Sequence, residues 1–485
     1  MTTAPTSHTR ENPARVDESV GTVEFATPAA VDRTVRRAAL AQVEWAARPL
    51  EERVALVRQA ADHVEKHLDE IAGLVARETG KVLGDSRGES AFAVAVLRHY
   101  ANRAPELLRE QGHDDERGRL VVRHRPFGVV GAITPWNAPI ILAVLKVAPA
   151  LVSGNTIVVK PSPLAPFGIQ RFLELAAEVL PAGVVDVVQG DVETVTALVE
   201  HPGISRVAFT GGDTAGRAIA SLAGRSLTPS VLELGGNDAA ILLDDVALTD
   251  ADAERLVMAA FATSGQVCMA IKRLYVHSSR LDEVVAQMRA AAERVLLVGD
   301  PLAPDATVGP VVNRASRERL EALVQSCREA GNQVIEIGGV AEGTDLDRGH
   351  FVRPVLVLGA DDSDVVVAQE QFGPVLPIQA FDEVDEVVVR ANAGDLGLGA
   401  SVWSADEERA FAVAARLEAG FTFVNTHNRT GMSLLAPFGG VKRSGWGREY
   451  GDEGLMEYVQ PCVIHAPGAF REGGAGSGAA AYPGT

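Results

Sequence analysis

Hydrophobic and polar positions follow two different patterns along the chain. From Ala29 to Thr79, and again from Glu89 to Leu108, apolar residues recur at spacings of three and four among charged ones, which predicts amphipathic helices. From Val121 onward, short β-branched runs alternate with helical segments. This alternation is typical of βαβ units with a mostly parallel sheet, so the predicted fold class is α/β.

Two α/β blocks are expected. The first has predicted strands at 129–133, 156–159, 184–188, 206–210, 231–234 and 240–243, and predicted helices at 138–151, 167–179 and 214–223. After residue 250 the second has a helix before Cys268, helices at 281–296, 314–330 and 407–417, and strands at 274–277, near 334, 355 and 376, at 400–403 and at 421–425. Ligands of parallel sheets bind where strands lead into helices, so the chemistry is expected in those loops.

The two ends of the chain lack these patterns. Residues 1–20 are polar, without the apolar segment of a secretory signal, and are expected to form a flexible arm. Residues 468–485 are rich in glycine and alanine and are expected to be mobile. The apolar stretch 140–152 is interrupted by Lys146 and is too short to span a bilayer.

Composition narrows the classes of function. The chain has 485 residues, enough for two or three domains, and a formal net charge of −19. This charge argues against a nucleic-acid or anionic-membrane partner. Three widely separated cysteines form neither a disulfide framework nor a CxxC metal pattern, so no metal site is predicted. Free thiols fit a reducing compartment, and the predicted location is the cytoplasm.

Cys268 is the strongest candidate for chemistry. It ends the segment TSGQVC at 263–268, and Glu233 precedes it within LELGGN at 232–237. A thiol in a glycine-containing loop and a carboxylate at the end of an apolar run are the groups needed for covalent catalysis followed by hydrolysis. A lone cysteine is more often a small buried hydrophobe, so the assignment depends on the rest of the chain.

Three other loops follow predicted strands. TPWN at 134–137 places Asn137 at the head of a helix, where its amide suits either an oxyanion donor or a helix cap. Lys160 follows the strand at 156–159 and suits a ribose or phosphate contact, although an exposed lysine is the commoner case. FTGGDTAG at 209–216 suits a phosphate-binding turn, but its spacing is not GxGxxG and a tight turn is an equal alternative.

Seven motifs occur together in one order. They are TPWN at 134–137, VVKPS at 158–162, FTGG at 209–212, LELGGN at 232–237, GQVC at 265–268, EQFGPV at 370–375 and PFGGVKRSGWGRE at 437–449. With this set the chain resembles the NAD(P)-dependent aldehyde dehydrogenase superfamily, in its non-acylating, hydrolytic branch, from Asn12 to about Val463. The resemblance implies an aldehyde dehydrogenase-like fold with two α/β domains and a small β oligomerisation element.

The resemblance also implies a division of the chain. Residues 1–105 and 127–233 would form a cofactor-binding domain, 234–437 a catalytic domain, and 106–126 with 452–465 an oligomerisation element. Residues 438–451 would return to the cofactor domain, and 468–485 would be a mobile tail. The segments Gly118–Arg125 and Tyr458–His465 alternate apolar and polar residues like strands of one sheet. A homodimer or homotetramer is expected by analogy.

Five catalytic residues are implied by the resemblance. Cys268 would attack the aldehyde carbonyl, and Asn137 with the Cys268 N–H would hold the resulting alkoxide. Hydride transfer to the nicotinamide would leave a thioester, which Glu233 would hydrolyse by activating water. Lys146 and Glu449 would support a proton relay on the same water path. Because relatives that pass the acyl group to coenzyme A lack this glutamate, the expected product is the free carboxylic acid.

The cofactor contacts are implied in the same way. They are Thr134, Pro135, Trp136, Lys160, Ser162, Gly211, Gly212, Gly216, Leu234, Gly235, Glu370 and Phe372. Lys160 and the turn at 209–216 match the adenosine side, whereas Glu370 and Phe372 match the nicotinamide ribose. Pro163 stands where many NAD-preferring members have a ribose-binding glutamate, and no arginine or second lysine flanks Lys160. NAD is therefore favoured, and NADP stays open.

Oxidation of an aldehyde to its acid with NAD(P) is the resulting prediction. Two alternatives stay open: a cysteine-dependent ester or thioester hydrolase without redox chemistry, and a catalytically silent scaffold protein. The candidate substrate tunnel favours an aliphatic or aromatic aldehyde, because Ala138, Ile141, Val267, Met269 and the loop 426–434 are mainly apolar. Arg429 in that loop would reverse this preference if it bound a substrate carboxylate, although a solvent-exposed arginine is the simpler interpretation.

Overall fold

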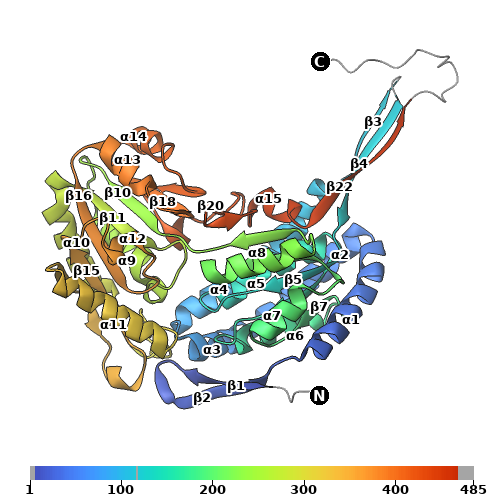
Figure 1. Cartoon of the computed structure of the whole chain (residues 1–485), viewed down its shortest axis with the longest axis horizontal. Helices are drawn as coiled ribbons and strands as arrows, with labels where there is room; N and C mark the ends of the chain where they lie inside the picture. Colours follow the sequence, from blue (N-terminus) through green and yellow to red (C-terminus); the bar gives the residue numbers. More distant parts are fainter. Residues whose placement is uncertain (1–5, 116–117, 468–485) are drawn as a thin grey trace.

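Two large sheets lie side by side in the computed structural model, and a three-stranded sheet projects away from them (Figure 1). The structure describes residues 6–115 and 118–467. Neighbouring strands of both large sheets are parallel except for one pair at an edge of each. The predicted α/β class with mostly parallel sheets is confirmed.

The first large sheet has six strands. In spatial order they are β21 (Gly445–Trp446), β9 (Ser230–Glu233), β8 (Ile204–Thr210), β5 (Val129–Ile133), β6 (Thr156–Lys160) and β7 (Val185–Val187). Only β21 is antiparallel to its neighbour, β9. The predicted strands between residues 129 and 234 are confirmed, with small differences at their ends. Their burial on both faces fits the continuous apolar runs in the sequence.

Helices surround the six-stranded sheet. They are α1 (Pro28–Ala47), α2 (Leu50–Val64), α3 (Leu68–Thr79), α4 (Leu83–Leu107), α5 (Pro139–Val152), α6 (Phe167–Ala177), α7 (Val192–Val199) and α8 (Asp213–Arg225). Helix α5 is buried along almost its whole length, Lys146 included, which explains why its sequence is apolar on every face. The predicted helices are confirmed; α7 was not predicted, because its 8 residues give too short a pattern.

The second large sheet has seven strands. In spatial order they are β13 (Gln333–Glu336), β15 (Val355–Leu358), β16 (Val375–Phe381), β11 (Ile271–His277), β10 (Asp238–Leu242), β18 (Gly399–Trp403) and β19 (Phe421–Val424). Its helices are α9 (Asp250–Phe261), α10 (Leu281–Val295), α11 (Arg314–Glu329), α12 (Val365–Ala368), α13 (Val384–Asn392) and α14 (Glu407–Ala414). The prediction that placed strand 240–243 in the first block was wrong. This strand pairs with β11 and β18, because pairing is set by tertiary contacts rather than by nearness in sequence.

The projecting sheet joins segments that are far apart in the chain. Its strands are β3 (Gln111–Asp115), β4 (Gly118–Pro126) and β22 (Val459–Pro467), and β22 follows the short helix α15 (Gly451–Met456). Both neighbours of β4 are antiparallel to it. The alternating pattern correctly predicted that β4 and β22 share a sheet. Strand β3 was missed, because its five residues are polar and exposed on both faces.

The N-terminal segment is a β-hairpin, so the prediction of a flexible arm was wrong for residues 7–20. Strands β1 (Ser7–Asn12) and β2 (Arg15–Glu24) pair antiparallel at the bottom of Figure 1. The Arg10 side chain is 2% exposed and donates to the carbonyl oxygens of Glu78 and Val312, at 2.8 and 2.6 Å. These partners are distant in sequence, so the local polar pattern gave no sign of them. Residues 1–5 and the predicted mobile tail 468–485 lie outside the described residues.

Candidate active site

Polar residues of the predicted loops lie at the carboxyl edge of the six-stranded sheet. Thr134, Lys160, Thr210 and Glu233 stand at or directly after the carboxyl ends of β5, β6, β8 and β9, which are neighbours in one parallel sheet. A cleft of about 800 Å³ is lined by the N-terminal turn of α8 from this side and by Glu370 from the other. Thr134, Lys160 and Glu233 therefore lie at the loops that the sequence predicted, and of the predicted site residues Glu370 lines this cleft.

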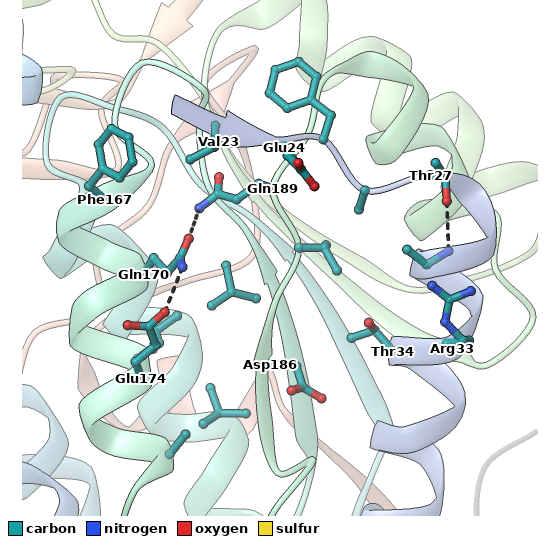
Figure 2. A pocket seen from close by; sticks show the side chains of 18 of the residues that line it. Val23, Glu24, Thr27, Arg33, Thr34, Phe167, Gln170, Glu174, Asp186 and Gln189 are labelled. Atoms are coloured by element: carbon teal, nitrogen blue, oxygen red, sulfur yellow. Dashed lines mark hydrogen bonds between the residues drawn. The ribbon is translucent and has the colours of Figure 1, made fainter. Parts of the chain in front are cut away.

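A separate groove lies at the other edge of the six-stranded sheet. It has a volume of about 900 Å³ and is bounded by β7, α1 and α6 (Figure 2). Polar side chains such as Gln170, Glu174 and Gln189 line it, but none of the predicted site residues does. The groove is therefore no part of the candidate site.

The loop that carries Cys268 has a strained backbone. Thr263, Ser264 and Gly265 have φ angles of 55°, 56° and 66°, in the left-handed region that residues with a side chain rarely adopt. A Cβ atom on Gly265 would lie 2.3 Å from the carbonyl oxygen of Gly373, so only glycine fits there. The Ser264 hydroxyl donates to the carbonyl oxygen of Gly309 at 2.6 Å. These contacts fix the direction in which the loop presents Cys268.

The Cys268 thiol is free and partly buried. Burial raises the pKa of Cys268 to about 12; the Lys272 ammonium opposes this shift, while the Glu370, Asp238 and Glu233 carboxylates add to it. The thiol is therefore protonated at neutral pH, and nucleophilic attack requires a base that accepts its proton. Glu233 is close enough to affect the thiol electrostatically.

Asn137 reaches the thiol loop. Its Nδ2 donates to the carbonyl oxygen of Gln266 at 2.9 Å, which leaves the second amide hydrogen for another acceptor. It does not cap α5, because the capping position is occupied by Ala138 and has no side-chain hydrogen bond. Instead Glu89 Oε1 accepts from the N–H groups of Ile140 and Ile141, at 2.8 and 3.1 Å. The helix-cap alternative for Asn137 is therefore wrong.

Glu233 belongs to a buried acid–base cluster. Lys146 Nζ lies 2.5 Å from Glu449 Oε1 and 2.7 Å from the Thr210 hydroxyl, and the Lys146 and Glu449 side chains are 0% and 3% exposed. Glu233 is also buried, and its Oε1 has no hydrogen-bond partner among the described residues. Burial and the Glu449 charge raise the pKa of Glu233 well above its ordinary value, although Lys146 and Arg448 oppose the shift.

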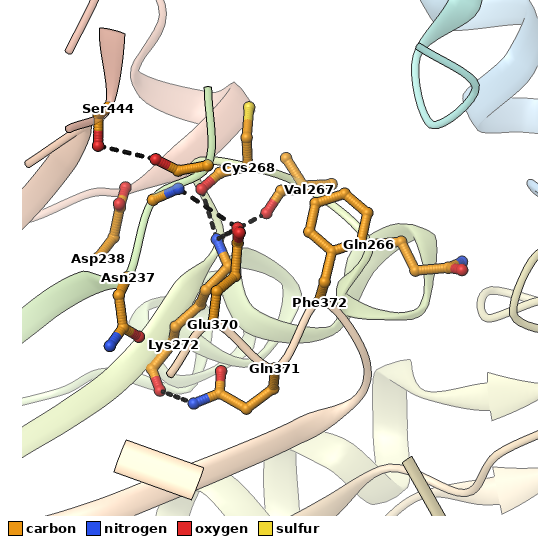
Figure 3. A network of polar contacts seen from close by, with 12 residues as sticks. Asn237, Asp238, Gln266, Val267, Cys268, Lys272, Glu370, Gln371, Phe372 and Ser444 are labelled. Atoms are coloured by element: carbon orange, nitrogen blue, oxygen red, sulfur yellow. Dashed lines mark hydrogen bonds and ion pairs between the residues drawn. The ribbon is translucent and has the colours of Figure 1, made fainter. Parts of the chain in front are cut away.

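Glu370 closes the other side of the thiol loop (Figure 3). Its Oε1 lies 3.3 Å from Lys272 Nζ and accepts from the Gly236 N–H, also at 3.3 Å. A Cβ atom on Gly235 would lie 2.3 Å from Glu370 Oε2, so a larger residue there would displace the end of the Glu370 side chain. Phe372, two residues later, has a φ of 45° and packs edge-on against Trp136, with ring centroids 5.7 Å apart.

The loops predicted to bind the cofactor have groups that fit a dinucleotide. Lys160 is buried, and burial lowers its pKa to about 8 against the opposing charge of Asp191, so a phosphate or ribose oxygen would give this cation a close partner. The buried Thr134 hydroxyl has no partner among the described residues. Gly212 caps the 13-residue helix α8 with open space around it, which leaves the N-terminal N–H groups of α8 free for a phosphate.

Other predicted cofactor residues act through packing. A Cβ atom on Gly211 would lie 2.4 Å from the Phe209 ring, and one on Gly216 would lie 2.5 Å from the Leu234 side chain. These glycines let the turn and helix α8 lie close to β8 and β9. Ser162 accepts a hydrogen bond from the Leu164 N–H at 3.2 Å, and Pro135 connects Thr134 to Trp136.

Cys268 packs against a hydrophobic core that it shares with several predicted tunnel residues. Partly exposed residues pack with Cys268 on the same core: Phe92, Ala138, Leu142, Met269, Phe421, Met432 and Leu434. Ile141, a predicted tunnel residue, is buried in that core. Arg429, in the short helical turn before Met432, donates to Asp85 Oδ2 at 3.1 Å. Arg429 is solvent-exposed, as the simpler interpretation expected, and it also forms an ion pair with Asp85.

Comparisons of sequence and structure with known proteins point to one family. The profile of the aldehyde dehydrogenase family matches residues 2–464. Geranial dehydrogenase of Castellaniella defragrans is 39% identical over 94% of this chain and 95% of its own length. An NADP⁺ succinate-semialdehyde dehydrogenase of Deinococcus radiodurans is 34% identical over 93% of both chains. Aldehyde dehydrogenase C of Pseudomonas syringae, a mutant solved with NAD⁺ and octanal, superposes with a TM-score of 0.87 at 34% identity, over 95% of this chain and 93% of its own.

The chain belongs to the aldehyde dehydrogenase family. It is an NAD(P)-dependent enzyme that oxidises aldehydes, as the sequence predicted. Among the described residues of this aldehyde dehydrogenase, no helix is long and apolar enough to cross a membrane.

Some polar groups at the site were missed from the sequence. Lys272 donates to carbonyl oxygens of the thiol loop, and Glu89, which accepts from N–H groups in the first turn of α5, forms a buried ion pair with Lys81. Asp238 and His427 are fully buried with 3.6 Å between Oδ2 and Nε2. For Lys272 a signal was present, because Lys272 and Arg273 stand side by side in the otherwise apolar segment 270–276, and charged residues there must be paired once the strand is buried.

Proposed function

We propose that Cys268 is the nucleophile of this aldehyde dehydrogenase and that Glu233 is its general base. The observation that supports this best is the free, buried oxygen of Glu233, which lies within electrostatic range of a thiol held in a strained loop. A buried carboxylate with a raised pKa accepts a proton readily, either from the thiol or from a water molecule. Attack of the thiolate on the carbonyl carbon gives a tetrahedral alkoxide on Cys268.

The alkoxide is received by two donors of the chain. They are the second hydrogen of Asn137 Nδ2 and the backbone N–H of Cys268, both fixed by the thiol loop before substrate arrives. NAD(P)⁺, when bound, supplies the hydride acceptor that oxidises the intermediate to a thioester. Glu233, after losing to solvent any proton taken from the thiol, accepts a proton from water; the hydroxide forms a bond to the thioester carbonyl carbon, the C–S bond breaks, and the acid and the Cys268 thiolate are released. The charges of Lys146 and Glu449 act on the pKa of Glu233 in opposite directions: Glu449 raises it and Lys146 lowers it.

The cofactor would be held across the cleft. The open N-terminus of α8 and Glu370 line the cleft and suit a phosphate and the ribose hydroxyls, and Lys160 and Thr134, at the ends of β6 and β5, suit the adenosine side. We expect a preference for NAD, because Asp191 adds a negative charge near Lys160 that opposes a 2′-phosphate. A kcat/KM for NADP above that for NAD would contradict this preference.

The substrate would be an apolar aldehyde. The predicted tunnel residues that pack on the same core as Cys268 carry hydrocarbon or thioether side chains, and Arg429 is paired with Asp85. Asp85→Asn should free Arg429 and raise kcat/KM for succinate semialdehyde several-fold relative to octanal. The double variant with Arg429→Gln is the matched control, and it should lose this gain. No change in the substrate ratio of Asp85→Asn would contradict a role for the pair in specificity.

The quaternary structure and location are further proposals. The projecting sheet exposes Val463 and Ile464, at 61% and 52%, which suits burial against a second copy in a dimer or tetramer. A molar mass from light scattering tests this. A cytoplasmic location fits the three free thiols, Cys268, Cys327 and Cys462. We also propose the predicted division into a cofactor domain around the six-stranded sheet and a catalytic domain around the seven-stranded one.

The decisive experiment mixes the protein with NAD or NADP and a panel of aliphatic, aromatic and carboxylate-bearing aldehydes. Reduced cofactor is followed by absorbance and the product acid by chromatography. We expect equimolar reduced cofactor and acid, with the highest kcat/KM for apolar aldehydes. Acid release from esters without any reduced cofactor would instead favour the hydrolase alternative.

A further inference from the structure

Lys272 is a buried cation that the mechanism above does not use. It stands near the start of β11, and its side chain is 3% exposed. A buried ammonium is costly unless its hydrogen bonds are satisfied. Lys272 Nζ donates to the Val267 carbonyl oxygen at 2.9 Å and to the Cys268 carbonyl oxygen, and it pairs with Glu370 (Figure 3). All its partners therefore belong to the thiol loop or to the cofactor side of the site.

The contact with Val267 bears on the proposed oxyanion donor. The Val267 carbonyl and the Cys268 N–H belong to the same peptide group. A cation at the oxygen of a peptide draws electron density from its nitrogen, which makes the N–H a stronger hydrogen-bond donor. Figure 3 shows the Cys268 sulfur directed away from the ammonium. Lys272 therefore acts on the reacting atoms through the backbone and through its charge, without contacting the sulfur.

The contact with Glu370 connects the same cation to the cofactor side. Glu370 lies in the cleft and is 22% exposed, whereas Lys272 is almost fully covered. The carboxylate is held between the Lys272 ammonium and the Gly236 N–H, so its position depends on the thiol loop. One ammonium thus sets the spacing between the thiol loop and the carboxylate that faces the cofactor.

We propose that Lys272 is a positioning residue that polarises the Val267–Cys268 peptide, strengthening the N–H that receives the substrate alkoxide, and that fixes Glu370 against the thiol loop. This inference rests on the proposed roles of Cys268 and Glu370. It adds a cation whose charge, and not only its bulk, contributes to the oxidation step.

Three variants separate charge from packing. Lys272→Met removes the charge at similar length, and Lys272→Arg keeps it. Lys442→Met is the control, because Lys442 also donates to two carbonyl oxygens, of Asn392 and Gly394, and pairs with Glu418, but its hydrogen bonds and ion pair among the described residues involve neither the thiol loop nor Glu370. Circular dichroism and thermal melting first establish that each variant is folded.

The first measurement is the single-turnover formation of reduced cofactor with saturating NAD and octanal. Lys272→Met should slow it by about 10- to 100-fold, less than the loss of a whole oxyanion donor, and should raise the KM for NAD. Lys272→Arg should recover part of both effects, and Lys442→Met should stay within about twofold of the parent enzyme, the ordinary result for a substitution that contacts no reacting group.

The second measurement needs neither cofactor nor aldehyde. The rate of Cys268 alkylation by iodoacetamide is followed against pH. Because the Lys272 ammonium lowers the pKa of Cys268, Lys272→Met should move the profile to higher pH and Lys272→Arg should not. If a folded Lys272→Met variant matches Lys442→Met in both measurements, the proposal is wrong. If the parent enzyme itself forms no reduced cofactor, the proposed function fails instead, and the alkylation profile still tests the charge of Lys272.

Discussion

Two buried lysine–glutamate pairs lie near the thiol loop, and they differ in solvent exposure. Lys146–Glu449, on the side of Glu233, is closed: its side chains are 0% and 3% exposed and its atoms are 2.5 Å apart. Lys272–Glu370, on the cofactor side, is open at one end: the glutamate is 22% exposed and the atoms are 3.3 Å apart. The same two residue types therefore form a sealed pair in one region and an accessible pair in the other.

This difference indicates different tasks. A sealed pair cannot exchange partners, so its charges act at a distance and set the proton affinity of Glu233. An accessible carboxylate can accept hydroxyl groups from a ligand while its lysine stays bound to the loop. Acid–base chemistry and cofactor contact are thus expected to respond separately to substitution on the two sides of Cys268.

The largest effect is expected from removing the Cys268 thiol, near which both lysine–glutamate pairs lie. Cys268→Ala should lower turnover by at least about 10⁴-fold, because no nucleophile remains to form the thioester. The measurement is steady-state formation of reduced cofactor with octanal. Retained binding of NAD, measured by calorimetry, is the control for folding. Turnover close to that of the parent enzyme would disprove the assigned nucleophile.

Glu233→Gln should slow thioester hydrolysis and leave the oxidation step in place. Steady-state turnover should fall by about 10²- to 10³-fold, the range typical of losing a general base. A burst of reduced cofactor should remain, because the oxidation step precedes hydrolysis. Rapid mixing measures the burst and the slow phase together. Equal loss of both phases would place Glu233 in an earlier step, as the base for the thiol.

Glu370→Gln should affect the cofactor side alone. We expect a higher KM for NAD and oxidation slower by about tenfold, since a neutral amide binds ribose hydroxyls and Lys272 less strongly than a carboxylate does. Thioester hydrolysis, measured after the burst, should be unchanged. A slower hydrolysis phase would show that the two sides are coupled more tightly than their separate contacts indicate.

Glu449→Gln should have the smallest effect on turnover, within about tenfold, and the clearest effect on its pH dependence. Glu233 acts as a base only when deprotonated, so activity is lost as pH falls through its raised pKa. The Glu449 charge contributes to that rise, so its removal should lower the pKa of Glu233 and move the acidic limb to lower pH. A movement to higher pH would contradict the assignment. The unpaired Lys146 should also destabilise the fold, by about 3 kcal/mol in thermal or denaturant unfolding.

Much of the candidate site was visible in the sequence, for a physical reason. Parallel strands of β-branched residues end at loops on one edge of a sheet, so Thr134, Lys160 and Glu233 could be placed together from pattern alone. The identity of the motifs then supplied their expected roles. The pairing of Arg429 with Asp85 could not be predicted, because the two residues are far apart in sequence and an exposed arginine leaves no pattern.

The sequence by itself determined the α/β class, the family and the main candidate groups, because these depend on local periodicity and on residue types at short spacing. Tertiary structure decided the N-terminal hairpin, whose buried Arg10 binds carbonyls of distant segments. The tertiary structure also decided which lysine forms an ion pair with which glutamate around Cys268. Burial makes each charge depend on neighbours brought in from other strands, and the sequence order of Lys146, Lys272, Glu370 and Glu449 does not reveal those neighbours.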